Sequence, residues 1–111
     1  MLSEEEATRH DERQTPFEPL RKAIAEYKEA HPDEGSRKKL AVLIGTGSMN
    51  PVHRMHLTMF DIAASYLERH ANIHALVAYL SPSCDDYVNH KLGTDAIPSI
   101  HRLEMCRLAA E

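Results

Sequence analysis

Residues 40–56 read LAVLIGTGSMNPVHRMH, and this segment carries the strongest structural signals in the chain. It begins with five consecutive apolar residues, Leu40–Ile44, which lie between three basic residues and Gly45. A short apolar run with such flanks is typical of a buried strand in a parallel sheet. Residues 45–52 are rich in glycine, asparagine and proline, and this composition predicts a loop. The segment therefore predicts a strand that ends in a loop directly before a helix.

The residues that follow continue an alternation of helix and strand. Residues 53–69 place apolar side chains around much of a helix, and residues 73–80 form a second apolar run that predicts another buried strand. Residues 81–98 predict a polar loop, after which Ser99 is expected to cap a last helix. Strands that alternate with helices indicate an α/β fold with a parallel sheet and right-handed crossovers. Such sheets bind ligands at the carboxyl ends of their strands, so we expect the site in the loops that follow the two strands.

Residues 1–39 differ from the rest of the chain and are expected to form a charge-rich N-terminal extension. Apolar residues at helical spacing predict an amphipathic helix over about 16–30, with Thr15-Pro16 at its start and His31-Pro32 at its end. We expect this helix to pack on the following domain, and binding of a partner protein or a targeting role is the alternative. Residues 1–14 are polar enough to be disordered.

The domain at residues 40–111 is predicted to be incomplete. Two parallel strands are too few for a stable sheet, because a parallel sheet needs several strands with helices on both faces. We therefore expect the chain to be the N-terminal part of a larger domain.

Composition and charge exclude several classes of protein. The 111 residues carry 13 Lys and Arg against 17 Asp and Glu, so the net charge of −4 argues against a strongly basic nucleic-acid binder. No apolar run approaches the roughly 20 residues that span a bilayer, and the acidic N-terminus does not resemble a secretory signal. Cys84 and Cys106 are too few for a disulfide scaffold or a four-cysteine zinc site. We expect an intracellular protein of the cytoplasm or nucleus, without membrane or nucleic-acid partners.

The loop at residues 45–52 departs from two common phosphate-binding motifs. A P-loop is excluded because no lysine lies between Lys39 and Lys91, and a dinucleotide fingerprint is excluded because Asn50 replaces its third glycine. The glycines nevertheless expose backbone N–H groups, and the positive end of the next helix points into the same space. His53 and His56 share one face of the first helical turn. This arrangement favours anion binding over the alternatives of two solvated histidines or a metal site, because a helix N-terminus repels cations.

Three segments together resemble a known family. Residues 47–57, GSMNPVHRMHL, resemble the first signature of the nucleotidylyltransferases with an (H/T)xxH motif, and within them the eukaryotic-type nicotinamide/nicotinate mononucleotide adenylyltransferases. Residues 81–87, SPSCDDY, are similar to that family's Ser-Pro-x-x-Asp-x-Tyr segment. Residues 97–105, IPSIHRLEM, resemble its Ile-Pro-x-x-His-Arg-x-x-Met helix start. The order of the three segments makes the resemblance specific.

The resemblance implies a Rossmann-like parallel sheet of the nucleotidylyltransferase type and transfer of AMP from ATP to nicotinamide or nicotinate mononucleotide. The products would be NAD, or its deamido form, and pyrophosphate. Mg²⁺ would be carried by the ATP phosphates, and the chain would supply no metal ligands. His56 is implied as the catalytic residue that holds the ATP phosphates, with His53 beside it. The substrate-binding residues that the resemblance implies are Gly47, Ser48, Met49, Met55, Asp85, Tyr87 and Lys91.

The chain also departs from the family pattern. Gly47 and Ser48 would contact the mononucleotide phosphate, but Met49 replaces the usual phenylalanine of that motif. Tyr87 would line the mononucleotide pocket, and relatives carry a lysine pair soon after it. Here Lys91 is the only lysine that follows, so it would take the phosphate-facing role.

Two other functions stay open at this point. The chain could be a catalytically inactive truncated relative that binds nucleotide phosphate, or another nucleotidylyltransferase with a different acceptor. The sequence leaves open the preference between the nicotinamide and nicotinate forms, and the oligomeric state, a homo-oligomer included.

Overall fold

The computed structural model describes residues 16–111. They divide into two compact units, and the boundary along the chain lies between Ser36 and Arg37. The first unit contains helix α2 (Glu18–Ala30) and a short 3₁₀ turn, η1 (Glu34–Ser36). The second contains two strands and three α-helices: β1 (Lys39–Gly47), α3 (Arg54–Tyr66), β2 (Ile73–Pro82), α4 (Asp85–Leu92) and α5 (Ser99–Ala109). No helix in residues 16–111 is both long enough and apolar enough to cross a membrane.

Helix α2 is the helix that the sequence predicts over residues 16–30. Its first turn contains Pro19, whereas Pro16 precedes the helix and Thr15, the predicted cap, lies outside the described residues. A proline is tolerated in the first turn because its missing N–H would have no partner within the helix. The helix ends at His31 as predicted: the His31 N–H donates to the Tyr27 carbonyl at 2.9 Å, and the two rings stack with centroids 4.2 Å apart.

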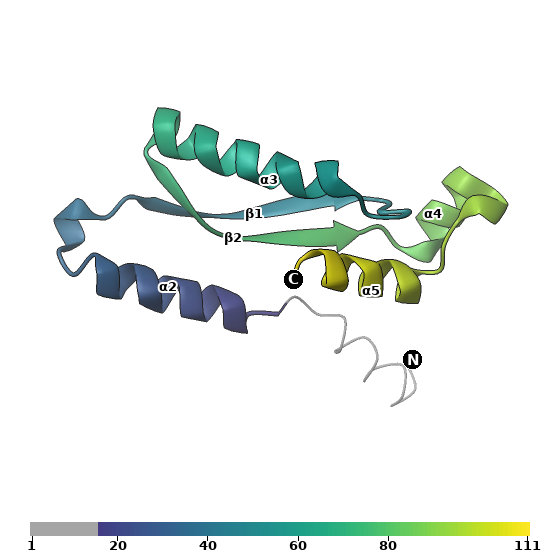
Figure 1. The fold of residues 1–111 in the computed structure, drawn as a ribbon, viewed down its shortest axis with the longest axis horizontal. Coiled ribbons are helices and arrows are strands. Elements are labelled where there is room, and N and C mark those ends of the chain that lie inside the picture. The colour runs from purple at the N-terminus through teal and green to yellow at the C-terminus, as the bar shows by residue number, and fades with distance from the viewer. Residues whose placement is uncertain (1–15) are drawn as a thin grey trace. The chain divides into compact units, whose positions relative to one another are not determined.

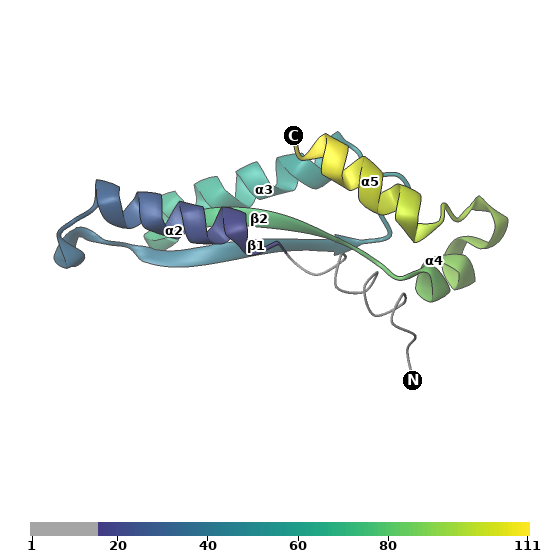
Figure 2. The same ribbon diagram turned by 90° about the horizontal axis from the view of Figure 1, so that it is seen from below.

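Strands β1 and β2 form a two-stranded parallel sheet, which confirms the predicted α/β, Rossmann-like class. The register pairs Lys39 with Ile73 at one end and Gly47 with Pro82 at the other. The carboxyl ends of both strands therefore lie side by side. In the view of Figure 1, α3 lies above the strands and α5 below them, with α4 beyond their carboxyl ends; Figure 2, seen from below, shows α3 and α5 on the same side of the strands.

Helix α3 packs on β1 through Phe60. A Cβ atom added to Gly45 would lie 2.8 Å from Cζ of Phe60, so the ring occupies the space that any larger residue at position 45 would need. The helix continues into a single π-helical turn, η2 (Leu67–Ala71), and stops at Asn72, which adopts the left-handed conformation with φ 55°. Asparagine tolerates this conformation better than most residues, so it ends the helix where the sequence predicts the break.

Strand β1 is less buried than the apolar run predicts. Leu40, Val42 and Ile44 are exposed, Ile44 to 65%, while Ala41 and Leu43 between them are half-buried. A parallel strand is buried on both faces only where helices cover both. In the second unit, α3 packs on β1 and α5 packs on β2, so the prediction of a fully buried strand is wrong for β1.

The predicted polar loop over residues 81–98 is also wrong, because this segment contains α4 and a short 3₁₀ turn, η3 (Gly93–Asp95). Helix α4 has too few apolar residues for its periodicity to be visible in the sequence. Val88, only 1% exposed, is its one buried residue, and Asp85 and Asp86 occupy the first turn, where carboxylates are favourable. The best-buried residues of the second unit belong to the loops and helices at the carboxyl ends of the strands: Met49, Val88, Arg102 and Cys106.

The start of α5 differs from the prediction as well. The N-cap position is Pro98, and Ser99 is the first helical residue. Ser99 does not accept a hydrogen bond as a cap would. Instead its N–H and its hydroxyl donate to the two carboxylate oxygens of Asp85, at 2.7 and 2.9 Å. A residue from α4 therefore satisfies the N-terminus of α5, and this replaces the local cap that the sequence indicates.

Candidate functional site

The candidate site lies at the carboxyl ends of the two strands. The Ser83 N–H donates to the Gly47 carbonyl at 2.8 Å, which extends the pairing of the strands into the loops that follow them. The first of these loops, residues 48–53, leads directly into α3. Figure 1 shows the start of α3 beside the arrowheads of both strands. The structure thus brings the segments that follow the two strands together at one edge of the sheet.

His53 and His56 cap the N-terminus of α3 reciprocally. Nδ1 of His53 accepts the backbone N–H of Met55 at 3.2 Å, and Nδ1 of His56 accepts the backbone N–H of His53 at 2.9 Å. The ring centroids lie 3.9 Å apart. A ring nitrogen that accepts a hydrogen bond carries no proton, so the neutral form of each ring has its N–H at Nε2. Both histidines therefore keep one donor for a group outside the helix.

This arrangement suits an anion. The first N–H groups of a helix carry partial positive charge, and the two Nε2–H groups add donors to the same end of α3. His53 is exposed and His56 is half-buried, so the ring pair is accessible from solvent. The rings are neither separated nor buried away from the edge where the strands end. The predicted pairing of these two histidines is therefore what the structure contains.

The loop between β1 and α3 contains a buried polar atom without a partner. The hydroxyl of Ser48 is buried and makes no hydrogen bond in the structure. Buried hydroxyls are normally satisfied, so the unpaired Ser48 hydroxyl is an exception in this loop. The next residue, Met49, has φ 51° and is 3% exposed, and a Cβ atom on Gly47 would lie 3.7 Å from its Cε. The buried Met49 side chain therefore lies beside Gly47 within this loop.

Asn50 ties this loop to the segment before α5, a role that the sequence analysis missed. Its side-chain Nδ2 donates to the Asp95 carbonyl at 2.9 Å, and its Oδ1 accepts the Ile97 N–H at 2.6 Å. The two bonds use both ends of the amide and link residues far apart in the chain. No local pattern in the sequence indicates these partners.

Arg102 is the second residue that the sequence analysis did not assign to the site. Its guanidinium is completely buried and bonds to Asp85 at 2.9 Å, and it also reaches backbone carbonyls of both loops. The available signal was its position four residues before Cys106, on the inner face of α5. A charged residue on an apolar helical face needs a buried partner, and the sequence does not identify that partner.

Asp85 acts as an anchor between elements. Partial desolvation alone would raise the pKa of its carboxyl group, but hydrogen bonds from Ser99 and Arg102 outweigh this effect and hold the pKa below its ordinary value. Both carboxylate oxygens are already used by these partners. The geometry therefore gives Asp85 a positioning role at the start of α4, where it links this helix to α5.

The remaining predicted residues lie on exposed surfaces. Tyr87 and Lys91 are one turn apart on α4, with Tyr87 57% exposed, and neither forms a hydrogen bond or ion pair with the described residues of the loop. Met55 is exposed in the first turn of α3. Gly47, Ser48 and the two histidines thus lie between the end of β1 and the first turn of α3, while the side chains of Met55, Tyr87 and Lys91 are exposed.

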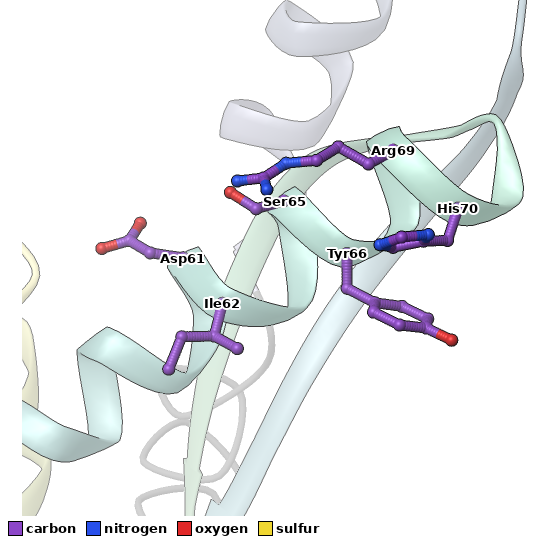
Figure 3. Close-up of a pocket in the computed structure, with 6 residues that line it drawn as sticks. All are labelled: Asp61, Ile62, Ser65, Tyr66, Arg69 and His70. Carbon is purple, nitrogen blue, oxygen red and sulfur yellow. The ribbon is translucent and has the colours of Figure 1, made fainter.

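A shallow depression of about 330 Å³ lies elsewhere, along the outer side of α3 and η2 (Figure 3). Its lining contains none of the predicted site residues and consists of Asp61, Ile62, Ser65, Tyr66, Arg69 and His70. The Tyr66 and His70 rings lie 4.8 Å apart. In the described part of the chain, no three His, Cys, Asp or Glu side chains gather where a metal ion could bind.

Comparisons with known proteins agree on one family. Residues 44–111 match the cytidylyltransferase-like family. The chain is 37% identical over 79 residues to the nicotinamide/nicotinic acid mononucleotide adenylyltransferase of Schizosaccharomyces pombe, an alignment that covers 71% of this chain and 20% of that protein. It is 38% identical to the Oryza sativa protein of the same name, and this alignment covers 70% of this chain and 29% of that protein. It is 40% identical to the Arabidopsis thaliana protein of that name, and this alignment covers 67% of this chain and 29% of that protein. The chain thus spans less than a third of the length of these relatives. No solved structure matches it significantly.

Proposed function

The chain belongs to the cytidylyltransferase-like family, and from this premise we propose that the protein transfers AMP from ATP to nicotinamide or nicotinate mononucleotide. The products are NAD or its deamido form and pyrophosphate. The names of three relatives that are 37–40% identical support this choice of substrates. The observation that carries the proposal is the pair of histidines at the start of α3, each with its free N–H on Nε2. We propose further that residues 40–111 are the N-terminal half of the catalytic domain and that residues 1–39 extend in front of it.

The residues of this site can meet most requirements of the proposed reaction. The nucleophile is a phosphate oxygen of the mononucleotide, which is already anionic at neutral pH, so no general base is needed. The site must hold two polyanions in line and neutralise the charge that grows on the α-phosphate and the leaving pyrophosphate. His56 and His53 would hold the ATP phosphates through Nε2–H. Ser48, with Gly47 beside it, would contact the mononucleotide phosphate; its hydroxyl is unpaired and would have to turn out of its buried position to donate.

The other site residues complete this assignment. Met55 would contact ATP from the first turn of α3, and Tyr87 and Lys91 would face the mononucleotide from α4, with Lys91 near its phosphate. Mg²⁺ would arrive with ATP as part of the substrate, coordinated by the phosphates, which is its usual mode of binding in nucleotide sites. The two cysteines are unpaired, which suits a reducing compartment inside the cell.

A second candidate is another nucleotidylyltransferase, since the matching family is described by cytidylyl transfer. A third is a relative that binds phosphate without turnover. The test is the formation of dinucleotide and pyrophosphate by the full-length protein with ATP and either mononucleotide. Better turnover with CTP, or with another acceptor, would favour the second candidate, and nucleotide binding without product would favour the third.

Two histidine variants sharpen this test. His56→Ala removes one donor to the transition state and is expected to lower kcat by about 10²- to 10³-fold. His70→Ala is the matched control, because His70 lies in η2 at the far end of the same helical segment and lines the separate depression. Equal activity of the two variants would reject the role proposed for His56.

A further inference from the structure

The buried charge of Arg102 has no role in the proposed reaction. The Arg102 side chain is 0% exposed and donates four hydrogen bonds: from Nε to the Ile97 carbonyl at 2.7 Å, from Nη1 to the Ser48 and Ser83 carbonyls at 2.8 and 2.7 Å, and from Nη2 to Asp85 at 2.9 Å. A buried charge persists only where it is paired and hydrogen-bonded. Four of the five N–H donors of the guanidinium are used in this way.

We propose that Arg102 is a positioning residue for phosphate binding, because its guanidinium holds the Ser48 and Ser83 carbonyls together and so fixes the two loops at the carboxyl ends of β1 and β2. The inference builds on the phosphate site of the proposed function. Arg102 does not reach the substrate. It acts through the backbone of the residues that do.

Peptide geometry explains how this bond controls the site. In a planar trans peptide, the carbonyl and the following N–H point in opposite directions. When Arg102 holds the Ser48 carbonyl, the Met49 N–H therefore points away from the buried guanidinium, and the same holds for Ser83 and the Cys84 N–H. Each loop thus has one N–H oriented by a bond to the same side chain. Asn50 anchors the first loop at its other end, so the backbone that carries the Ser48 side chain is held from both sides.

The planar fork of arginine is essential to this role. Nη1 reaches two carbonyls at once while Nε and Nη2 reach two further acceptors, and the single ammonium of lysine cannot reproduce that geometry. Arg102→Lys keeps the charge but loses this geometry. It is therefore expected to bind mononucleotide almost as poorly as Arg102→Met. Recovery of wild-type affinity in Arg102→Lys would show that charge alone matters and would overturn the proposal.

A double-mutant cycle separates positioning from simple stabilisation of the fold. The full-length protein is titrated with nicotinamide mononucleotide by calorimetry, well below its unfolding temperature. Ser48→Ala alone is expected to weaken binding about 10- to 100-fold, the effect of one hydrogen bond to a charged group. In the Arg102→Met background the same change is expected to weaken binding less than about 2-fold, because the backbone that carries the hydroxyl is no longer held in place. An equal loss in both backgrounds would refute the inference.

Controls keep the outcomes distinct. Arg107→Met makes the same substitution on the same helix, but Arg107 is exposed and pairs with Glu104 and Glu111. In that background Ser48→Ala should therefore weaken mononucleotide binding as much as it does in the otherwise wild-type protein. If Arg102→Met does not fold, Arg102→Lys takes its place in the cycle.

A wild-type protein that binds mononucleotide but forms no dinucleotide would refute the proposed function alone, since the cycle still decides this inference. A wild-type protein that binds neither mononucleotide nor inorganic phosphate would refute both.

Discussion

Substitutions at His56 can separate the two tasks that the structure gives to this side chain. Its Nδ1 accepts the backbone N–H of His53 at 2.9 Å and so caps α3, and its Nε2–H is left for a phosphate. Glutamate at this third helical position has carboxylate oxygens that can accept the same N–H, as in a capping box. Its ionised side chain has no hydrogen-bond donor. His56→Glu is therefore expected to keep the cap and lose the phosphate contact, whereas His56→Ala loses both.

The structure sets the size of each effect. Loss of a helix cap costs about 1 kcal/mol, so His56→Ala should lower the free energy of unfolding by roughly that amount, while His56→Glu should change it by a few tenths at most. Loss of a donor to the transition state should lower kcat by about 10²- to 10³-fold in His56→Ala, and by at least as much in His56→Glu, whose carboxylate also repels phosphate. Both variants should thus have low activity, and only His56→Ala should be less stable.

Two measurements on the full-length protein decide this prediction. Urea unfolding followed by circular dichroism gives the stability of each variant, and formation of dinucleotide from ATP and mononucleotide gives kcat. Wild-type turnover in His56→Glu would refute the reasoning about Nε2. An unchanged urea midpoint in His56→Ala would refute the reasoning about the cap.

Three further predictions concern the residues that support the site. Because the pKa of Asp85 is lowered in the folded state, its contribution to stability should be complete near neutral pH and lost as the pH falls below about 4; the slope of urea stability against pH in this range should be shallower in Asp85→Asn. Gly45→Ala places a methyl group 2.8 Å from Phe60 Cζ and should destabilise the protein by about 1–3 kcal/mol, and a thermal midpoint equal to the wild type would contradict this packing. Cys84 is exposed and should react with iodoacetamide at pH 8, whereas burial raises the pKa of Cys106 and should protect it, as peptide mass spectrometry would detect.

Local signals predicted most of the elements correctly. The apolar runs before Gly45 and after Asn72 became β1 and β2, and the histidine pair became the start of α3. Such features depend on residues within a few positions of each other, so a single sequence displays them. The weakly amphipathic α4 was missed for the same reason, because one buried valine creates no visible period.

Burial was harder to predict than secondary structure. An apolar run does not reveal which helices cover a strand, and Ile44 is exposed although it ends the most apolar segment of the chain. The start of α5 was predicted from Ser99 alone, yet its partner is Asp85 on another helix. Both errors arose because the deciding contacts come from elements that are distant in the sequence.

The sequence alone determined that this protein has an α/β fold with a glycine-containing loop and two histidines at a helix N-terminus. These follow from hydrophobic periodicity and from the spacing of neighbouring residues. Tertiary structure alone decided how that loop is held. Arg102 reaches Ser48 across 54 positions, and Asn50 reaches Ile97 across 47. A buried guanidinium or amide bonds with whatever acceptors the fold brings to it, and those partners are backbone groups that every residue carries, so no sequence pattern marks them.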